Sequence, residues 1–151
     1  MRQLSRRDAL ALGALGAAVT FFGPQERASA AVKEAADQIA RFTGGKTATT
    51  GKVSIELPEI AENGNTVPLS VSVDAPMTAD DYVSEILVVA DGNPNPGVAT
   101  FQFSPLSGKA EASTRIRLAT TQNIIAVAKT SKGEFLTNQK LVKVTIGGCG
   151  G

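Results

Sequence analysis

The sequence contains one thiol, and it stands third from the C-terminus. Cys149 follows an alternating apolar run at residues 142–146 and lies between Gly147-Gly148 and Gly150-Gly151. Glycines have no side chains to pack and chain ends fray, so we expect no role in a core for this thiol. In an oxidising compartment an idle, exposed thiol is a liability because it forms unwanted disulfides. We therefore predict that Cys149 is functional, and that its glycines let it enter active sites of other proteins.

The composition excludes several kinds of catalytic site within this chain. The 151 residues include no histidine, which excludes His-based acid–base catalysis, His metal ligands and a Ser-His-Asp triad. A single cysteine cannot form an internal disulfide, a Cys-x-x-Cys pair or a zinc site. We predict a protein that is not an enzyme, with no cofactor and no metal.

Four other segments resemble functional sites but favour structural interpretations. Gly45-Lys46-Thr47 resembles the end of a phosphate-binding loop, yet Ala40 stands where that motif requires glycine, so a helix cap is expected. Asp80-Asp81 lacks the spaced oxygen ligands of a calcium loop. Asn93-Pro94-Asn95-Pro96 predicts a rigid turn, because each proline fixes its own φ and restricts the residue before it. Arg115 and Arg117 share one face of a predicted strand and are interpreted as a solvated face.

The N-terminal 30 residues have the organisation of an export signal. Arg2 and the Ser5-Arg6-Arg7 group precede an uncharged stretch at residues 9–23, and Ala28-Ser29-Ala30 supplies an A-x-A cleavage site. The paired arginines resemble a twin-arginine signal, although Ala9 stands where phenylalanine is usual. The apolar stretch is short for a membrane span of about 20 residues. We predict cleavage after Ala30 and a periplasmic protein with no membrane anchor.

Residues 31–151 form the predicted mature chain. The leader contains four arginines and two acidic residues, so its removal changes the formal net charge from +1 to −1. This balance gives no basic surface for nucleic acid or anionic membranes. No repeat or low-complexity block divides the chain, so we predict one domain at residues 31–146 and a flexible carrier arm at residues 147–151.

The hydrophobic pattern of the mature chain changes from a helical period to a period of two. Val32, Ala35 or Ala36, Ile39 and Phe42 recur at helical spacing, and Gly44-Gly45 follows as a cap. Seven short runs with strand character follow, separated by turn residues. They lie at residues 53–57, 69–73, 82–90, 99–103, 112–118, 124–128 and 134–146. The pattern predicts an all-β fold: an immunoglobulin-like antiparallel sandwich of about seven strands with a short N-terminal helix, or alternatively a barrel.

The ends of the chain and several internal segments together resemble the SoxY family of periplasmic sulfur-oxidation (Sox) proteins. The resemblance rests on the terminal Gly147-Gly148-Cys149-Gly150-Gly151, the twin-arginine leader, the single cysteine and the β-rich domain. The internal segments are Met77-Thr78 with Asp81-Tyr82-Val83, the Asn93–Pro96 turn with Val98-Ala99-Thr100-Phe101, and Ser113-Thr114-Arg115-Ile116-Arg117-Leu118.

This resemblance implies a carrier of sulfur intermediates. Thiosulfate would be joined oxidatively to Cys149 by the haem enzyme SoxAX, SoxB would release sulfate by hydrolysis, and SoxCD would oxidise the remaining persulfide in some organisms. The resemblance also implies a heterodimer with SoxZ, a second small β-sandwich that lacks a leader of its own. The site residues would be Cys149 for covalent attachment, with Gly147, Gly148, Gly150 and Gly151 as the arm.

Two alternatives remain open at the level of sequence. Terminal Gly-Gly resembles ubiquitin-like sulfur carriers, which are activated with ATP at the C-terminal carboxylate, although ATP is not expected in the periplasm. A secreted β-sandwich binding module could instead use Cys149 for an intermolecular disulfide. The mass of the intact protein distinguishes all three.

Overall fold

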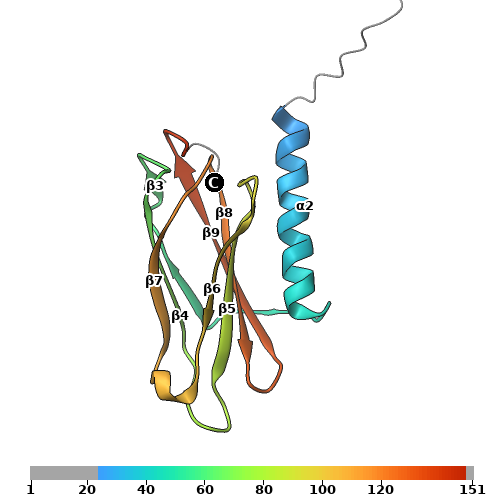
Figure 1. The fold of residues 1–151 in the computed structure, drawn as a ribbon, viewed down its shortest axis with the longest axis vertical. Helices are drawn as coiled ribbons and strands as arrows, with labels where there is room; N and C mark the ends of the chain where they lie inside the picture. The colour runs from blue at the N-terminus through green and yellow to red at the C-terminus, as the bar shows by residue number, and fades with distance from the viewer. Residues whose placement is uncertain (1–23, 149–151) are drawn as a thin grey trace, which may run out of the picture.

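A computed structural model describes residues 24–148, which form a β-sandwich with one helix beside it (Figure 1). The elements in chain order are α2 (Pro24–Thr43), β1 (Thr49–Thr50), β2 (Val53–Glu56), β3 (Ile60–Ala61), β4 (Val67–Val73), β5 (Val83–Ala90), β6 (Gly97–Gln102), η1 (Pro105–Ser107), β7 (Ala110–Ile116), β8 (Gln122–Thr130) and β9 (Phe135–Val144). All seven predicted strands are present, which confirms the predicted immunoglobulin-like sandwich.

The strands form two sheets with free edges. The larger sheet has the order β1-β9-β8-β5-β6, and β3 also pairs with β9. The smaller sheet has the order β2-β4-β7. The long strands pair in antiparallel fashion, whereas the two short strands β1 and β3 pair with β9 in parallel. Strands β6 and β7 therefore each end a sheet, and within the described part of the chain one edge of each is unpaired.

The alternation seen in the sequence places one face of each sheet in the core. In β4 every second residue from Val67 to Val73 is buried, and β2 alternates in the same way. These side chains pack against the inner face of β5 and β8, where the larger sheet supplies Val83, Ile86, Val88, Ala90, Ile124, Ala126 and Ala128. The apolar run in β5 is explained by its position between β8 and β6, with both faces covered.

Helix α2 covers part of the outer face of the larger sheet (Figure 1). Val89 and Val127, which point away from the sandwich core, are consequently buried. The ring of Phe42 packs edge-to-face on that of Phe135, with centroids 5.9 Å apart. At the end of the helix Gly44 and Gly45 adopt positive φ angles, and the Gly45 N–H donates to Ala40 O, so the predicted glycine cap is confirmed.

The helix differs from its prediction in length and in the face it buries. It is 20 residues long and begins at Pro24, before the predicted cleavage point after Ala30. Residues 24–30 lack apolar periodicity, but proline is favoured at a helix start and alanine, glutamate and arginine are good helix formers. Ala35 is buried, in agreement with the predicted apolar stripe. Val32, in the same stripe, is 52% exposed, whereas Ala31, outside the stripe, is buried.

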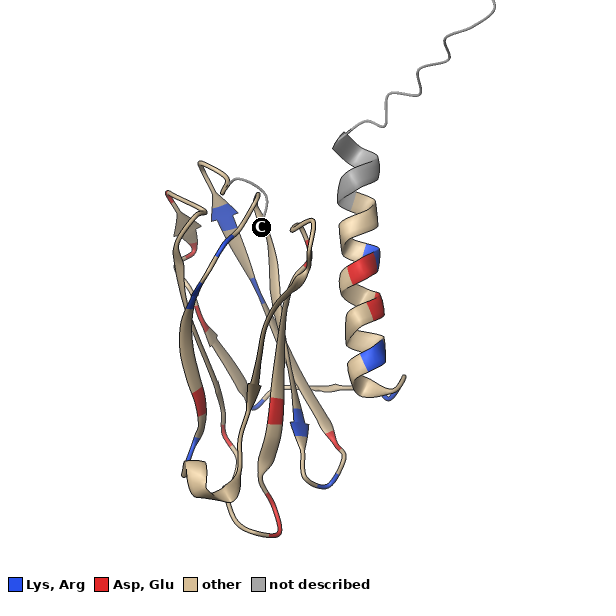
Figure 2. Ribbon diagram, in the orientation of Figure 1, with Lys and Arg blue, Asp and Glu red and all other residues tan. Residues whose placement is uncertain are grey.

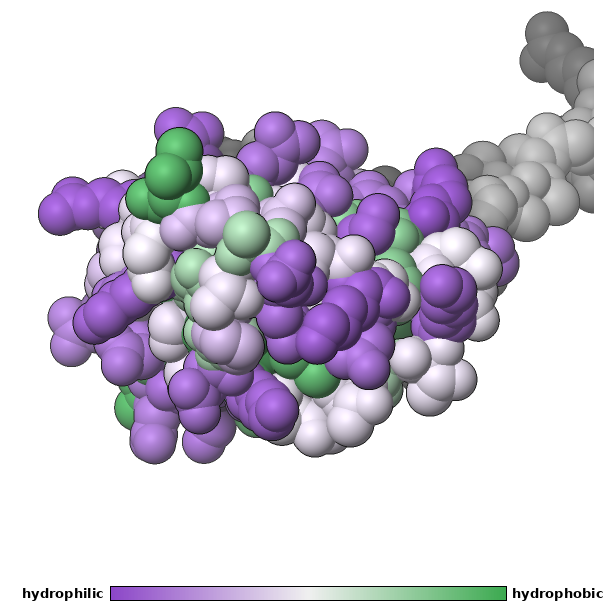
Figure 3. Space-filling view, turned by 90° about the horizontal axis from the view of Figure 1, so that it is seen from below, coloured by the Kyte–Doolittle hydropathy of each residue, from purple (hydrophilic) through white to green (hydrophobic). Residues whose placement is uncertain are grey.

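Charges are mixed over the strands and the helix (Figure 2). On the described residues no helix is long and apolar enough to cross a membrane. Figure 3 views the end of the sandwich near η1, which is largely hydrophilic with isolated apolar side chains. One exposed apolar side chain near this end is Leu106 in η1, at 97% exposure. Strand β9 ends at the opposite end of the sandwich (Figure 1).

Candidate functional site

The residues that lead to the terminal cysteine cross one end of the sandwich and are hydrogen-bonded to it. After β9 ends at Val144, the Thr145 N–H donates to Ala61 O at 3.1 Å. Ile146 O then accepts from the Gly64 N–H at 2.8 Å, and the Gly148 N–H donates to Leu118 O at 2.9 Å. Leu118 in turn donates its N–H to Gly64 O at 2.8 Å. We call Gly64, Leu118 and Ala119 the tail seat.

The tail seat accepts glycine for steric reasons. A Cβ on Gly147 would clash with the carbonyl oxygen of Ala119, and a Cβ on Gly64 would clash with that of Leu118. A Cβ on Gly148, which is buried, would lie 3.1 Å from Gly64 O and from Asn65 Oδ1. These glycines therefore permit close backbone packing, and the φ angles of all three lie outside the left-handed region.

The first two residues of the predicted arm, Gly147 and Gly148, contact the domain. Gly147 packs against the Ala119 carbonyl, and the Gly148 N–H donates to Leu118 O. Contacts with the domain extend to Gly148, two residues beyond the predicted domain boundary. Cys149, Gly150 and Gly151 lie outside the described residues, so the predicted roles of Cys149 and of the flexible arm stay predictions.

A buried asparagine in the β5–β6 turn helps to position the tail seat. Asn93, 4% exposed, donates from Nδ2 to Arg117 O at 2.8 Å, and its Oδ1 accepts from the Ala119 N–H at 2.9 Å. These two hydrogen bonds bracket Leu118. The β5–β6 turn thus fixes the backbone of the β7–β8 loop at the point where Gly147 and Gly148 pack.

Further amide groups tie the same two loops together. Gln122, which is also buried, donates from Nε2 to Asn93 Oδ1 and to Thr120 O, each at 2.9 Å. Its Oε1 accepts from the Gly92 N–H at 2.7 Å. The carboxylate of Asp91 accepts from the N–H and the side-chain amide of Asn123, at 2.8 and 2.9 Å. We call Asp91, Asn93, Gln122 and Asn123 the amide cluster.

The sequence prediction covered the turn but missed the amide cluster. Residues 91–96 do form a turn, as the prolines predicted. The hydrogen bonds join residues about 30 positions apart, which no local pattern encodes. One signal was available: Gln122 is a polar residue at the start of an apolar strand, at a position that proves to be buried.

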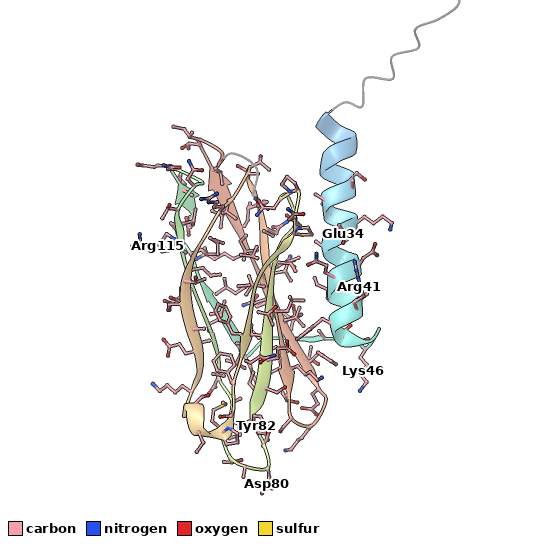
Figure 4. The ribbon with its side chains drawn as sticks, viewed as in Figure 1. Glu34, Arg41, Lys46, Asp80, Tyr82 and Arg115 are labelled. Atoms are coloured by element: carbon pink, nitrogen blue, oxygen red, sulfur yellow. The ribbon has the colours of Figure 1, made fainter. Side chains whose placement is uncertain are left out.

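Two of the other sequence candidates, Asp80-Asp81 and Gly45-Lys46-Thr47, do not converge on the tail. Asp81 pairs with Lys132, whose Nζ lies 2.7 Å from the carboxylate, and this hydrogen bond and attraction raise the pKa of Lys132. Asp80 and Tyr82 lie with them at the end far from the tail (Figure 4). Lys46 lies in the loop after α2 (Figure 4). Within residues 24–148 no cluster of three or more acidic, Cys or His residues could hold a metal.

Comparison with protein families gives a match over residues 39–149 to the family described as "Sulfur oxidation protein SoxY". The chain belongs to the SoxY family. A solved structure of the sulfur carrier protein SoxY from Chlorobium limicola f thiosulfatophilum is 32% identical, with a TM-score of 0.61. The alignment covers 76% of this chain and 98% of that chain. The family match ends on Cys149 and includes both seated glycines.

Two further structures are similar in fold alone. A superoxide reductase (neelaredoxin) from Ignicoccus hospitalis is 21% identical with a TM-score of 0.56, covering 62% of this chain and 80% of that one. A superoxide reductase from Nanoarchaeum equitans is 12% identical with a TM-score of 0.54, covering 64% of this chain and 100% of that one. A comparison with curated proteins finds no match.

Proposed function

We propose that this protein carries sulfur intermediates covalently on Cys149 during thiosulfate oxidation and presents them to partner enzymes. The observation that carries the proposal is the SoxY family match, which extends through Cys149, together with the similarity to a SoxY sulfur carrier protein. The role suits an unactivated thiol, because a cysteine of ordinary pKa near 8.5 is only a few per cent thiolate at neutral pH. It therefore reacts when an enzyme activates it.

The proposed cycle begins with an oxidative coupling. SoxAX would join thiosulfate to Cys149 through a new S–S bond, with release of one proton and transfer of two electrons to the haem enzyme. SoxB would then hydrolyse the terminal S–S bond, releasing sulfate and leaving a persulfide on the cysteine. In organisms that have it, SoxCD would oxidise that persulfide sulfur. The carrier itself catalyses none of these steps.

The tail seat defines where the carrier arm begins. Gly148 is held on Leu118 O, so contacts with the domain reach the residue directly before Cys149. Glycines on both sides of the cysteine present no side chain to the walls of a narrow channel. We propose that the seat directs the thiol outward from one end of the sandwich, and that partner enzymes, with SoxZ as the permanent partner, act on it there.

The proposed location is the periplasm, reached by twin-arginine export and followed by cleavage after Ala30. The leader motif at residues 5–7 and the A-x-A site support this proposal. The composition suits that compartment, since a single cysteine leaves no internal disulfide to misform.

The test is the mass of the intact protein after incubation with thiosulfate and the coupling enzyme. Wild type should gain the mass of the thiosulfate-derived group, and Cys149→Ser should gain nothing while its free energy of unfolding stays within about 0.5 kcal/mol. The serine variant replaces only sulfur by oxygen and so serves as its own matched control for folding. Loading of Cys149→Ser would point to the C-terminal carboxylate of a ubiquitin-like carrier, and a disulfide-linked dimer as the sole product would point to a secreted binding module.

A further inference from the structure

A groove lies beside the tail seat, between the free edges of the two sheets. It has a volume of about 230 Å³ and is lined by part of β6, the end of β7 and the β5–β6 turn. The lining residues are Asn93, Asn95, Gly97, Val98, Ala99, Thr114, Arg115, Ile116 and Arg117. Since β6 and β7 end their sheets, no strand among residues 24–148 closes the sandwich at this point.

The groove is positively charged and has room for an anion. Arg115 and Arg117 are exposed, and neither forms an ion pair with any other residue in the described range. None of the lining residues is acidic. Figure 4 places Arg115 on the half of β7 near the tail, away from Asp80 at the other end. Guanidinium groups present a planar fork of N–H donors that matches the oxygens of sulfonate-like anions.

The described chain ends next to this groove. Gly148 is hydrogen-bonded to Leu118 O, and Leu118 directly follows Arg117. Leu118 is fully buried, so the side chains of Arg117 and Leu118 diverge, one to the surface and one into the core. Asn93 contributes to both places, because it lines the groove and also bonds Arg117 O and the Ala119 N–H. The next residue of the chain is Cys149, which would carry the cargo.

We propose that the groove between β6 and β7 binds the anionic end of the sulfur cargo attached to Cys149 of the same chain, through Arg115 and Arg117. The inference rests on the proposed function, which places a thiosulfonate anion on that cysteine. A tethered anion experiences a high effective concentration, in the millimolar range for short linkers, so even weak sites at the base of the arm are occupied. The arginines are exposed, so binding is reversible and weakens with salt, leaving the cargo free to enter partner enzymes.

The test compares an anionic and a neutral adduct of the same cysteine, made without any Sox enzyme. The Cys149 thiolate attacks tetrathionate, forms the thiosulfonate adduct and releases thiosulfate; with methyl methanethiosulfonate it forms a neutral methyl disulfide and releases methanesulfinate. Backbone amide and arginine Nε–Hε signals are then followed by NMR on the complete chain. We expect the signals of residues 97–99 and 114–117 to shift with the anionic adduct only, and to return as salt is raised.

Two variants test whether Arg115 and Arg117 cause these NMR shifts. Combined Arg115→Ala and Arg117→Ala should abolish the shifts at residues 97–99, whereas Lys109→Ala, which removes one charge at the other end of β7, should retain them. Any of three outcomes would overturn the inference. The shifts could be identical with both adducts, they could be confined to residues 145–148, or they could grow with protein concentration. In this experiment the adduct forms chemically, without a Sox enzyme. Its outcome is therefore independent of the enzymatic loading experiment that tests the proposed function.

Discussion

The Gly148 N–H donates a hydrogen bond to Leu118 O, and this bond holds the residue before Cys149 on the β7–β8 loop. The neighbouring Gly147 packs on the carbonyl of Ala119 so closely that no side chain fits. Two of the four glycines around the cysteine are thus parts of a packed contact. The position of the residue before Cys149 therefore depends on the loop that carries Leu118 and Ala119.

Gly147→Val should reduce stability as well as function. Its Cβ would clash with Ala119 O, so the tail would have to leave the seat and the Gly148–Leu118 hydrogen bond would be lost. We expect a loss of about 1–2 kcal/mol, comparable to one or two net hydrogen bonds, measured by urea unfolding. Turnover with each partner enzyme should slow. Gly150→Val, placed beyond the described seat, is the matched control, and equal stability of the two variants would argue against the seat.

Asn93→Ala should destabilise the tail seat and lower the free energy of unfolding. The substitution removes the hydrogen-bond partner of three groups: Arg117 O, the Ala119 N–H and one N–H of the Gln122 side-chain amide. Unpaired buried groups cost about 1–3 kcal/mol each, and with partial compensation by water we expect a total near 3 kcal/mol in denaturant unfolding.

The same substitution should change the chemistry of the tail. We expect the rate at which Cys149 reacts with a small thiol reagent to change in Asn93→Ala at temperatures where the domain stays folded. A double-mutant cycle with Gln122→Ala should give a coupling energy of about 0.5–3 kcal/mol, typical of side chains in one network. Additive effects of the two substitutions would contradict the description of the amide cluster as one network.

The face of α2 that packs on the sheet can be tested at two positions. Phe135 is buried and meets the ring of Phe42, so Phe135→Ala should cost about 3 kcal/mol or more. Val32 is 52% exposed, so Val32→Ala should stay within about 0.5 kcal/mol. Thermal or urea unfolding measures both. A large loss for Val32→Ala would restore the helical face predicted from the sequence.

Local periodicity predicted the parts of this fold in which one face of an element is buried. The alternation in β4 and the continuous apolar run in β5 correspond to a half-buried and a central strand. Strands β1 and β3 were missed because two residues cannot show a period, and their pairing with β9 is non-local. In α2 the predicted apolar stripe included the buried Ala35, but it also included Val32, which is exposed, and it omitted Ala31, which is buried.

The sequence nominates Cys149 as the candidate site from residue type and the predicted export, and that nomination stays a prediction. The geometry that leads to it could not be predicted, because a glycine that gives freedom and a glycine that permits close packing are identical in sequence. Gly64 lies between the predicted strands at residues 53–57 and 69–73, yet its N–H donates to Ile146 O and its carbonyl oxygen accepts from the Leu118 N–H. The amide cluster depends on which loops meet at one end of the sandwich, and that follows from the order of the strands.

Replacement of Arg6-Arg7 by Lys-Lys tests the proposed route of export and the proposed partner together. Twin-arginine export moves folded proteins, usually because a cofactor must be inserted first, and we predict no cofactor here. Folding before export would instead allow a bound partner to cross with this chain. We expect a stable, non-covalent heterodimer with SoxZ that forms in the cytoplasm, buries roughly 1,200–2,000 Å² and leaves the Cys149 tail accessible.

In the Lys-Lys variant both proteins should accumulate in the cytoplasm, measured by immunoblots of periplasmic and cytoplasmic fractions. Arg2→Lys, which preserves the paired arginines, is the matched control and should export both proteins normally. If this chain alone is lost from the periplasm while the partner is still exported, the two cross separately and the co-export proposal fails. If both are still exported, the leader does not use the twin-arginine route.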